Sequence, residues 1–142
     1  MDRILIVDDE KAIRDILSEM LSVMGFEVVV ASSGNEGLHL FLNDSFDLVL
    51  TDLKMPGIDG WTLALYIKEK SPKTPIVLIT GEEKGGIMEK LEGSCVDSVM
   101  FKPFRLEDIQ ETVQNMLHTG YLQRTTSVSS KSRPSSKKMD LT

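Results

Sequence analysis

The stretch Ile4-Leu5-Ile6-Val7-Asp8-Asp9-Glu10 joins an unbroken apolar run to three consecutive carboxylates. A short, mostly β-branched run of this kind is typical of a strand that is buried on both faces of a sheet. Similar runs follow at residues 28–30, 48–50, 76–79 and 99–101. Each run is separated from the next by a segment long enough for a helix, so the chain is expected to alternate strands with helices.

The segments between the runs carry helical periodicity. The first holds an apolar stripe that ends at Gly25 and consists of Ile13, Ile16, Leu17, Met20, Leu21 and Met24. Four further helices are indicated at residues 38–42, 61–67, 87–91 and 109–117. Strict alternation indicates a parallel sheet with right-handed crossovers and helices on both faces. We predict an α/β fold, a doubly wound (βα)₅ unit whose five-stranded parallel sheet has the flavodoxin-like order 2-1-3-4-5.

The chain is long enough for one hydrophobic core. Its 142 residues are 41% hydrophobic and 27% charged, which is ordinary globular composition. We expect a single domain over residues 1–120. Residues 121–142 are expected to form a flexible, basic, Ser-rich tail or linker, because they have almost nothing to bury that would offset the entropy of ordering them. Cys95 is the single cysteine, which excludes an internal disulfide.

Charge is distributed unevenly along the chain. Residues 1–120 carry 11 Lys and Arg against 21 Asp and Glu, whereas residues 121–142 carry five against one. An acidic domain repels nucleic acid, so we expect no direct nucleic-acid binding by residues 1–120. No apolar run approaches the roughly 20 residues that cross a bilayer, and the first residues lack the features of a signal peptide. We therefore expect a cytoplasmic protein without a membrane partner.

Polar side chains follow the buried runs at the points where the predicted strands end. Asp8 and Asp9 follow the first run, Asp52 the third, Thr80 the fourth and Lys102 the fifth. These strand ends share one edge of a parallel sheet, where ligands bind. Singly, each residue has an ordinary explanation as a helix cap, a turn hydroxyl or a solvated lysine. Together, the carboxylates would repel one another and raise their pKa values unless a cation lay among them.

The type of cation follows from the ligands. Hard oxygen ligands with few protein contacts suit Mg²⁺, which keeps several waters and often completes its shell with phosphate oxygens. No His or Cys stands at the strand ends to favour a softer metal. Beside Mg²⁺, a carboxylate can attack phosphorus while an ammonium and a hydroxyl bind phosphoryl oxygens. The residues therefore favour a Mg²⁺-dependent phosphoryl-transfer site.

Four motifs make the chain resemble the receiver domains of bacterial two-component response regulators, over residues 2 to about 119. In order, the motifs are residues 4–10 (ILIVDDE), 47–60 (DLVLTDLKMPGIDG), 75–81 (PIVLITG) and 102–104 (KPF). The resemblance implies that Asp52 is the phosphoacceptor and that Thr80 and Lys102 contact the phosphoryl group. It also implies a cis peptide bond between Lys102 and Pro103. The Mg²⁺ ligands that it implies are Asp8, Asp9, Asp52 and the backbone carbonyl of Lys54.

The resemblance also implies a signalling role. A sensor histidine kinase or a phosphotransfer protein would donate the phosphoryl group, and a downstream effector protein or domain would read the altered surface. The protein would catalyse only its own phosphorylation and dephosphorylation, so it is expected to be a switch and not a metabolic enzyme. Whether phosphorylation also produces a homodimer stays open.

Three positions distinguish this chain within the resemblance. Val99 stands where the family usually has Tyr or Phe, so the family's aromatic switch does not carry over directly. Lys54 and Glu82 stand two residues after Asp52 and Thr80, at positions that flank the path of the hydrolytic water in the family. Their long side chains either pair across the mouth of the site or point separately into solvent.

Other functions account for these residues less fully. An aspartyl phosphohydrolase usually carries an acid–base carboxylate two residues after its nucleophile, where this chain has Lys54. A degenerate receiver that never switches is disfavoured because the full set of acidic, hydroxyl and ammonium residues is present. The chain is also compatible with the input half of a longer transcriptional regulator that is cut in its linker.

Overall fold

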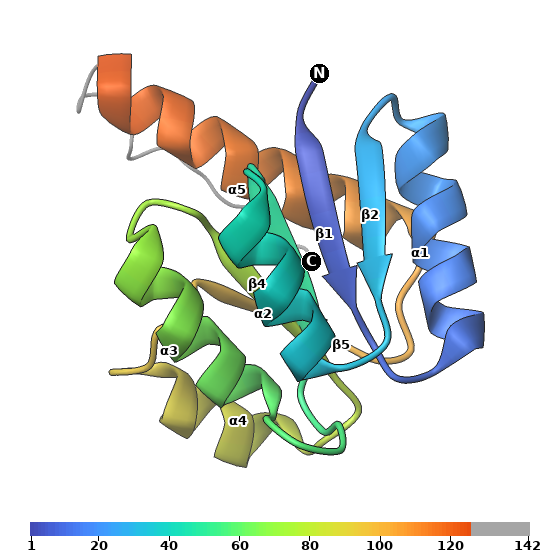
Figure 1. Cartoon of the computed structure of the whole chain (residues 1–142), viewed down its shortest axis with the longest axis vertical. Helices are drawn as coiled ribbons and strands as arrows, with labels where there is room; N and C mark the ends of the chain where they lie inside the picture. The colour runs from blue at the N-terminus through green and yellow to red at the C-terminus, as the bar shows by residue number, and fades with distance from the viewer. Residues whose placement is uncertain (126–142) are drawn as a thin grey trace.

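The computed structural model describes residues 1–125, with side chains as far as Leu117. Five strands and five helices alternate along these residues (Figure 1). The strands are β1 (Arg3–Val7), β2 (Glu27–Ala31), β3 (Leu48–Asp52), β4 (Ile76–Thr80) and β5 (Ser98–Phe101). The helices are α1 (Lys11–Val23), α2 (Gly34–Asn43), α3 (Gly60–Lys70), α4 (Lys84–Leu91) and α5 (Leu106–Thr125).

All neighbouring strands pair in parallel, in the order β2-β1-β3-β4-β5. This confirms the predicted doubly wound α/β fold and its flavodoxin-like strand order. Val7 at the end of β1 lies opposite Thr51 of β3. The residues that directly follow this pair, Asp8 and Asp52, therefore lie side by side at the carboxyl edge of the sheet.

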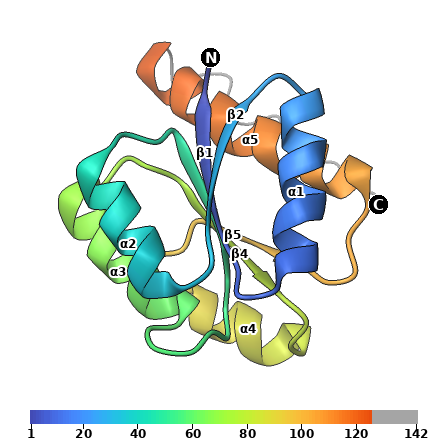
Figure 2. The ribbon, with the colours of Figure 1, turned by 45° about the vertical axis from the view of Figure 1, so that its right-hand side comes forward.

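The sheet is covered on both faces. Helices α1 and α5 lie on one side and α2, α3 and α4 on the other (Figure 2). Strand β1 divides its side chains between the two resulting cores, with Leu5 and Val7 in one and Ile4 and Ile6 in the other. All four are buried, as predicted for a central strand with helices on both sides.

Two apolar residues that were predicted to be buried are exposed. Val30 of β2, which was expected in a strand buried on both faces, is 41% exposed because β2 is an edge strand with β1 as its neighbour. Ile16 of α1 was expected in the buried stripe but is 44% exposed. The helix turns by about 100° per residue, so the stripe that faces the sheet centres on Leu17 and Leu21, and Ile16 lies at its margin.

Several local predictions are confirmed and one boundary is displaced. Gly25 follows α1 with a φ of 97°, a conformation that glycine adopts without steric cost. The Lys102–Pro103 peptide bond is cis. Helix α5 continues to Thr125, so it includes residues 121–125, which were expected to belong to the tail. The rest of that expected tail, residues 126–142, lies outside the described residues.

Within the part of the chain that the structure describes, no helix combines the length and the apolar character needed to cross a membrane.

Candidate functional site

Asp8 is fixed in place by the turn between β1 and α1. Its backbone N–H donates to the carbonyl of Ala31 over 3.1 Å, and its Oδ1 accepts the N–H of Glu10 at 2.8 Å. The side chain is buried. Neither Asp8 nor Asp9 caps α1, which was the ordinary alternative for them. The N-cap is Glu10, which makes no side-chain capping bond. The carboxylates of both aspartates therefore do not serve the helix and lie at the edge of the sheet.

Asp52 is the last residue of β3 and is almost fully buried. Its Oδ1 accepts the N–H of Leu53 at 3.0 Å. The loop that follows folds back closely, since the N–H of Gly60 donates to the Leu53 carbonyl over 2.8 Å. A Cβ at Gly60 would lie 2.6 Å from the Asp52 carbonyl oxygen, so only glycine fits there. Gly60 therefore lets the start of α3 pack closely against the backbone of Asp52.

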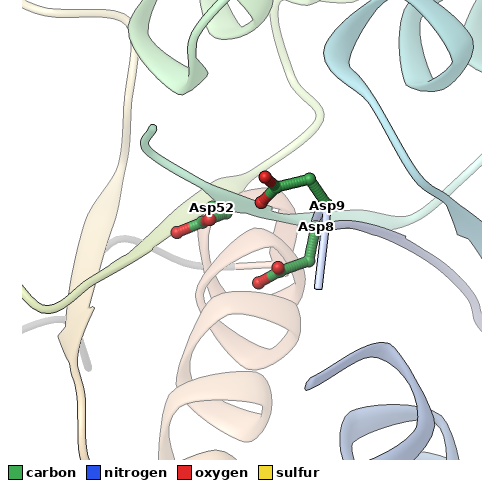
Figure 3. A group of neighbouring side chains, drawn as sticks. All are labelled: Asp8, Asp9 and Asp52. Carbon is green, nitrogen blue, oxygen red and sulfur yellow. The ribbon is translucent and has the colours of Figure 1, made fainter. Parts of the chain in front are cut away.

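Asp8, Asp9 and Asp52 form an acidic cluster (Figure 3). One carboxylate oxygen from each lies within 4.8 Å of the others. Asp8 Oδ2 is buried without a hydrogen-bond partner. A buried polar atom that lacks a partner is costly, and a bound cation would remove that cost. The oxygen-only donor set and its orphaned oxygen thus fit a hard divalent cation such as Mg²⁺.

The electrostatics of the cluster agree with this arrangement. Burial raises the pKa of Asp8 to about 6, and the neighbouring Asp52 carboxylate acts in the same direction. Burial also raises the pKa of Asp52, while the Lys102 ammonium opposes that shift. Both shifts follow from bringing like charges into a region with little solvent.

Lys102 supplies the positive charge of the site. Its Nζ lies 3.4 Å from Asp52 Oδ1 and 3.8 Å from Asp8 Oδ2. The backbone N–H of Lys102 donates to the Thr80 carbonyl over 2.7 Å, which ties the ends of β5 and β4 together. The structure thus brings Lys102 to carboxylates at the ends of β1 and β3, which are distant from it in sequence.

Thr80 lies at the same sheet edge but makes a local contact. Asp52 pairs with Ile79, so Thr80 stands one position beyond the partner of Asp52. Its Oγ1 accepts the N–H of Glu82 at 3.0 Å, which is the turn contact that the ordinary interpretation expected. This bond uses the hydroxyl as an acceptor and leaves its proton available to a phosphoryl oxygen.

Lys54 and Glu82 pair across the mouth of the site. Lys54 Nζ lies 2.8 Å from Glu82 Oε2, so the structure has the first of the two arrangements that the sequence left open. The Glu82 carboxylate raises the pKa of the Lys54 ammonium. The role predicted for the Lys54 backbone carbonyl as a metal ligand is a separate matter and stays a prediction.

The sequence did not predict several contacts at this site, two of which involve Lys102 and Asp52. Glu10 Oε1 lies 3.7 Å from Lys102 Nζ, although Glu10 was given no role. The available signal was its position directly after Asp8 and Asp9. The Leu53 N–H, which binds Asp52, has no sequence signal because every residue except proline carries this donor.

The chain is similar in sequence to known proteins of one family. A family model described as the response regulator receiver domain matches residues 4–114. Regulatory protein AtoC of Escherichia coli (strain K12) is 37% identical over 118 residues, which are 82% of this chain and 25% of AtoC. The uncharacterized transcriptional regulatory protein YrkP of Bacillus subtilis (strain 168) is 40% identical over 113 residues, which are 78% of this chain and 47% of YrkP.

A solved structure extends the comparison to the fold. Response regulator protein TrrA from Thermotoga maritima, in complex with Mg²⁺-BeF, matches with a TM-score of 0.76 and 36% identity. The match covers 82% of this chain and 100% of TrrA. Against curated relatives such as AtoC and YrkP, by contrast, the chain spans about a quarter to a half of their length.

Proposed function

The chain belongs to the response regulator receiver domain family, and from that premise we propose that Asp52 accepts a phosphoryl group from the phosphohistidine of a sensor histidine kinase or phosphotransfer protein. A carboxylate oxygen of Asp52 would attack phosphorus as the bond from phosphorus to the histidine nitrogen breaks. The observation that carries the proposal is the convergence of three carboxylates and the Lys102 ammonium on one sheet edge.

The proposal includes a magnesium ion held by Asp8, Asp9, Asp52 and the backbone carbonyl of Lys54. When bound, Mg²⁺ neutralises charge on the phosphoryl oxygens. The orphaned Asp8 Oδ2 supports this ligand set. So does the family relationship to TrrA, whose structure contains Mg²⁺-BeF.

The other residues act on the phosphoryl group directly. The Lys102 ammonium, 3.4 Å from Asp52 Oδ1, would bind a phosphoryl oxygen and offset its negative charge. The Thr80 hydroxyl would donate its free proton to a second oxygen. In this proposal the protein catalyses its own phosphorylation and dephosphorylation only. A downstream effector protein or domain would then read the changed surface.

A direct test uses a small phosphodonor, which removes the need to identify the kinase. Acetyl phosphate with Mg²⁺ should add one phosphoryl group to the wild type, as measured by intact mass, and none to Asp52→Asn, because an amide nitrogen is not a nucleophile here. The matched control is Asp15→Asn, which changes the same group on the exposed side of α1, where Asp15 pairs with Lys11. Equal labelling of wild type and Asp52→Asn would contradict the assignment.

A second candidate is that the chain is the input part of a longer transcriptional regulator. Relatives such as YrkP are named as transcriptional regulators, and the chain spans less than half of YrkP. In that case residues 126–142, which follow α5 and are basic and Ser-rich, would serve as the linker to an output domain. The size of the native protein, detected in the source cells with an antibody to the receiver, tests this directly.

A further inference from the structure

Lys102 has three carboxylate partners, and one of them lies outside the proposed metal site. The distances from Lys102 Nζ are 3.4 Å to Asp52 Oδ1, 3.7 Å to Glu10 Oε1 and 3.8 Å to Asp8 Oδ2. Glu10 is 64% exposed by its side chain, whereas the two aspartates are buried. The ammonium thus lies between a buried acidic pair and an exposed carboxylate at the mouth of the site.

These three partners respond differently to a bound cation. Asp8 and Asp52 would share their charge with Mg²⁺, so their attraction for the ammonium falls. Glu10 keeps its full charge because it is not one of the proposed ligands. Its backbone is fixed beside the acidic pair, since the Glu10 N–H donates to Asp8 Oδ1 over 2.8 Å. In the metal-loaded protein, Glu10 is therefore the carboxylate best able to retain Lys102.

We propose that Glu10 is a positioning residue that holds the Lys102 ammonium at the mouth of the site and competes with the phosphoryl group for it. The inference rests on the proposed function, because it concerns the lysine that would bind the phosphoryl group. Glu10 would thereby set how strongly the protein holds a phosphoryl group without touching that group or the metal. An ion pair with an exposed carboxylate is weak, so the expected effect is about two- to fivefold.

The test measures the affinity for beryllofluoride, a phosphoryl mimic, at saturating Mg²⁺ by chemical-shift titration. Glu10→Gln keeps the side-chain shape and the backbone bond to Asp8 but removes the charge. Its dissociation constant for beryllofluoride should be about two- to fivefold lower than that of the wild type. The control is Glu83→Gln, which makes the same charge change in the exposed turn before α4. Equal tightening in both variants, or no tightening in Glu10→Gln, would overturn the proposal.

A second comparison separates a direct effect on Lys102 from a general effect of charge. In a Lys102→Met background, Glu10→Gln should leave the beryllofluoride affinity unchanged, since the coupled partner is absent. The ¹⁵Nζ resonance of Lys102 should also shift in Glu10→Gln and stay in place in Glu83→Gln. A full effect of Glu10→Gln without Lys102, or an unmoved Lys102 resonance, would reject the positioning role. A wild type that fails to bind beryllofluoride would reject the proposed function along with it.

Discussion

Among single residues, Lys54 and Glu82 form an ion pair that contributes little to stability. Its position beside the site would allow it to affect the rate of phosphoryl loss. The Lys54 side chain is 77% exposed and that of Glu82 is 39% exposed, so the pair contributes only about 0–1 kcal/mol. It nevertheless bridges the loops that leave β3 and β4, directly beyond Asp52 and Thr80. In the proposed function, we infer that a water attacking the phosphorylated Asp52 approaches past this pair.

We predict that Lys54→Asn speeds the loss of the phosphoryl group severalfold, because the shorter side chain no longer reaches Glu82 and opens the path for water. A barrier lower by about 1.4 kcal/mol gives a tenfold faster reaction. The decay of the phosphorylated protein measures the effect, while the melting temperature and Mg²⁺ affinity should change little. Lys11→Asn, which breaks the exposed Lys11–Asp15 pair on α1, is the control. Unchanged or slower decay in Lys54→Asn would eliminate the shielding role.

Asp9 is the exposed member of the acidic cluster, so its contributions to stability and to metal binding can be separated. Asp9→Ala should leave the metal-free protein about as stable as the wild type, since the side chain buries little. It should weaken Mg²⁺ binding, because one anionic ligand of a hard cation is lost. A Mg²⁺ titration followed by chemical shifts, with Asp15→Asn as the control, measures this. A dissociation constant equal to that of the wild type would remove Asp9 from the ligand set.

At the scale of elements, α3 and α4 differ in how firmly they are held. Helix α3 begins with a capping bond from the Thr62 N–H to Asp59 Oδ1, and its Gly60 packs against the end of β3. Helix α4 has no side-chain cap, and Ile87 is its one buried residue. Its Gly85 has open space where a Cβ would stand. That glycine weakens the helix without a packing reason.

We therefore predict opposite effects for two glycine substitutions. Gly85→Ala should stabilise the protein by about 0.5–1 kcal/mol, because alanine favours the helix and limits the unfolded chain. Gly60→Ala should destabilise it, since a Cβ there would lie 2.6 Å from both the Asp52 carbonyl oxygen and Leu78 Cδ1. Chemical denaturation of both variants and the wild type provides the comparison. Destabilisation by Gly85→Ala would contradict the prediction, because it would mean that a side chain at this position is sterically unfavourable.

Some of these elements could be predicted from the sequence, and others depend on contacts between distant segments. The run at residues 4–7 predicts a buried central strand, and the acids that follow it predict a site because they combine with Asp52, Thr80 and Lys102 at the other strand ends. The apolar pattern alone could not tell that Val30 is exposed, because its run resembles those of the central strands, and only the predicted order 2-1-3-4-5 places this strand at the edge of the sheet. The pattern also could not place Glu10 beside Lys102. That contact depends on side-chain direction at a turn, which no sequence spacing encodes.

At the scale of the whole molecule, folding assembles charges that repel one another. Burial and the neighbouring Asp52 raise the pKa of Asp8 from its ordinary value of 3.8 to about 6. Protons therefore bind the folded protein more tightly than the unfolded chain over this range. The resulting stabilisation is fully present below about pH 4 and is lost as the pH rises through about 6. Burial also raises the pKa of Asp52, which acts in the same direction as Asp8, whereas the lowered pKa values of Glu36 and Asp44 act at lower pH.

The metal-free wild type should thus melt at a higher temperature at about pH 5 than at about pH 7.5, and Asp8→Asn should show a smaller difference because its side chain cannot ionise, while Asp52 retains its own contribution. Mg²⁺ should reverse the trend, since at higher pH it finds Asp8 ionised and removes the repulsion that ionisation created. At ten times its dissociation constant, a ligand adds about 1.4 kcal/mol, which is several degrees for a domain of this size. Thermal unfolding with EDTA or Mg²⁺ at both pH values measures the linkage. If Mg²⁺ raised the melting temperature as much at the lower pH as at the higher, or as much in Asp8→Asn as in the wild type, then Asp8 would not be the group that couples protons, metal and stability.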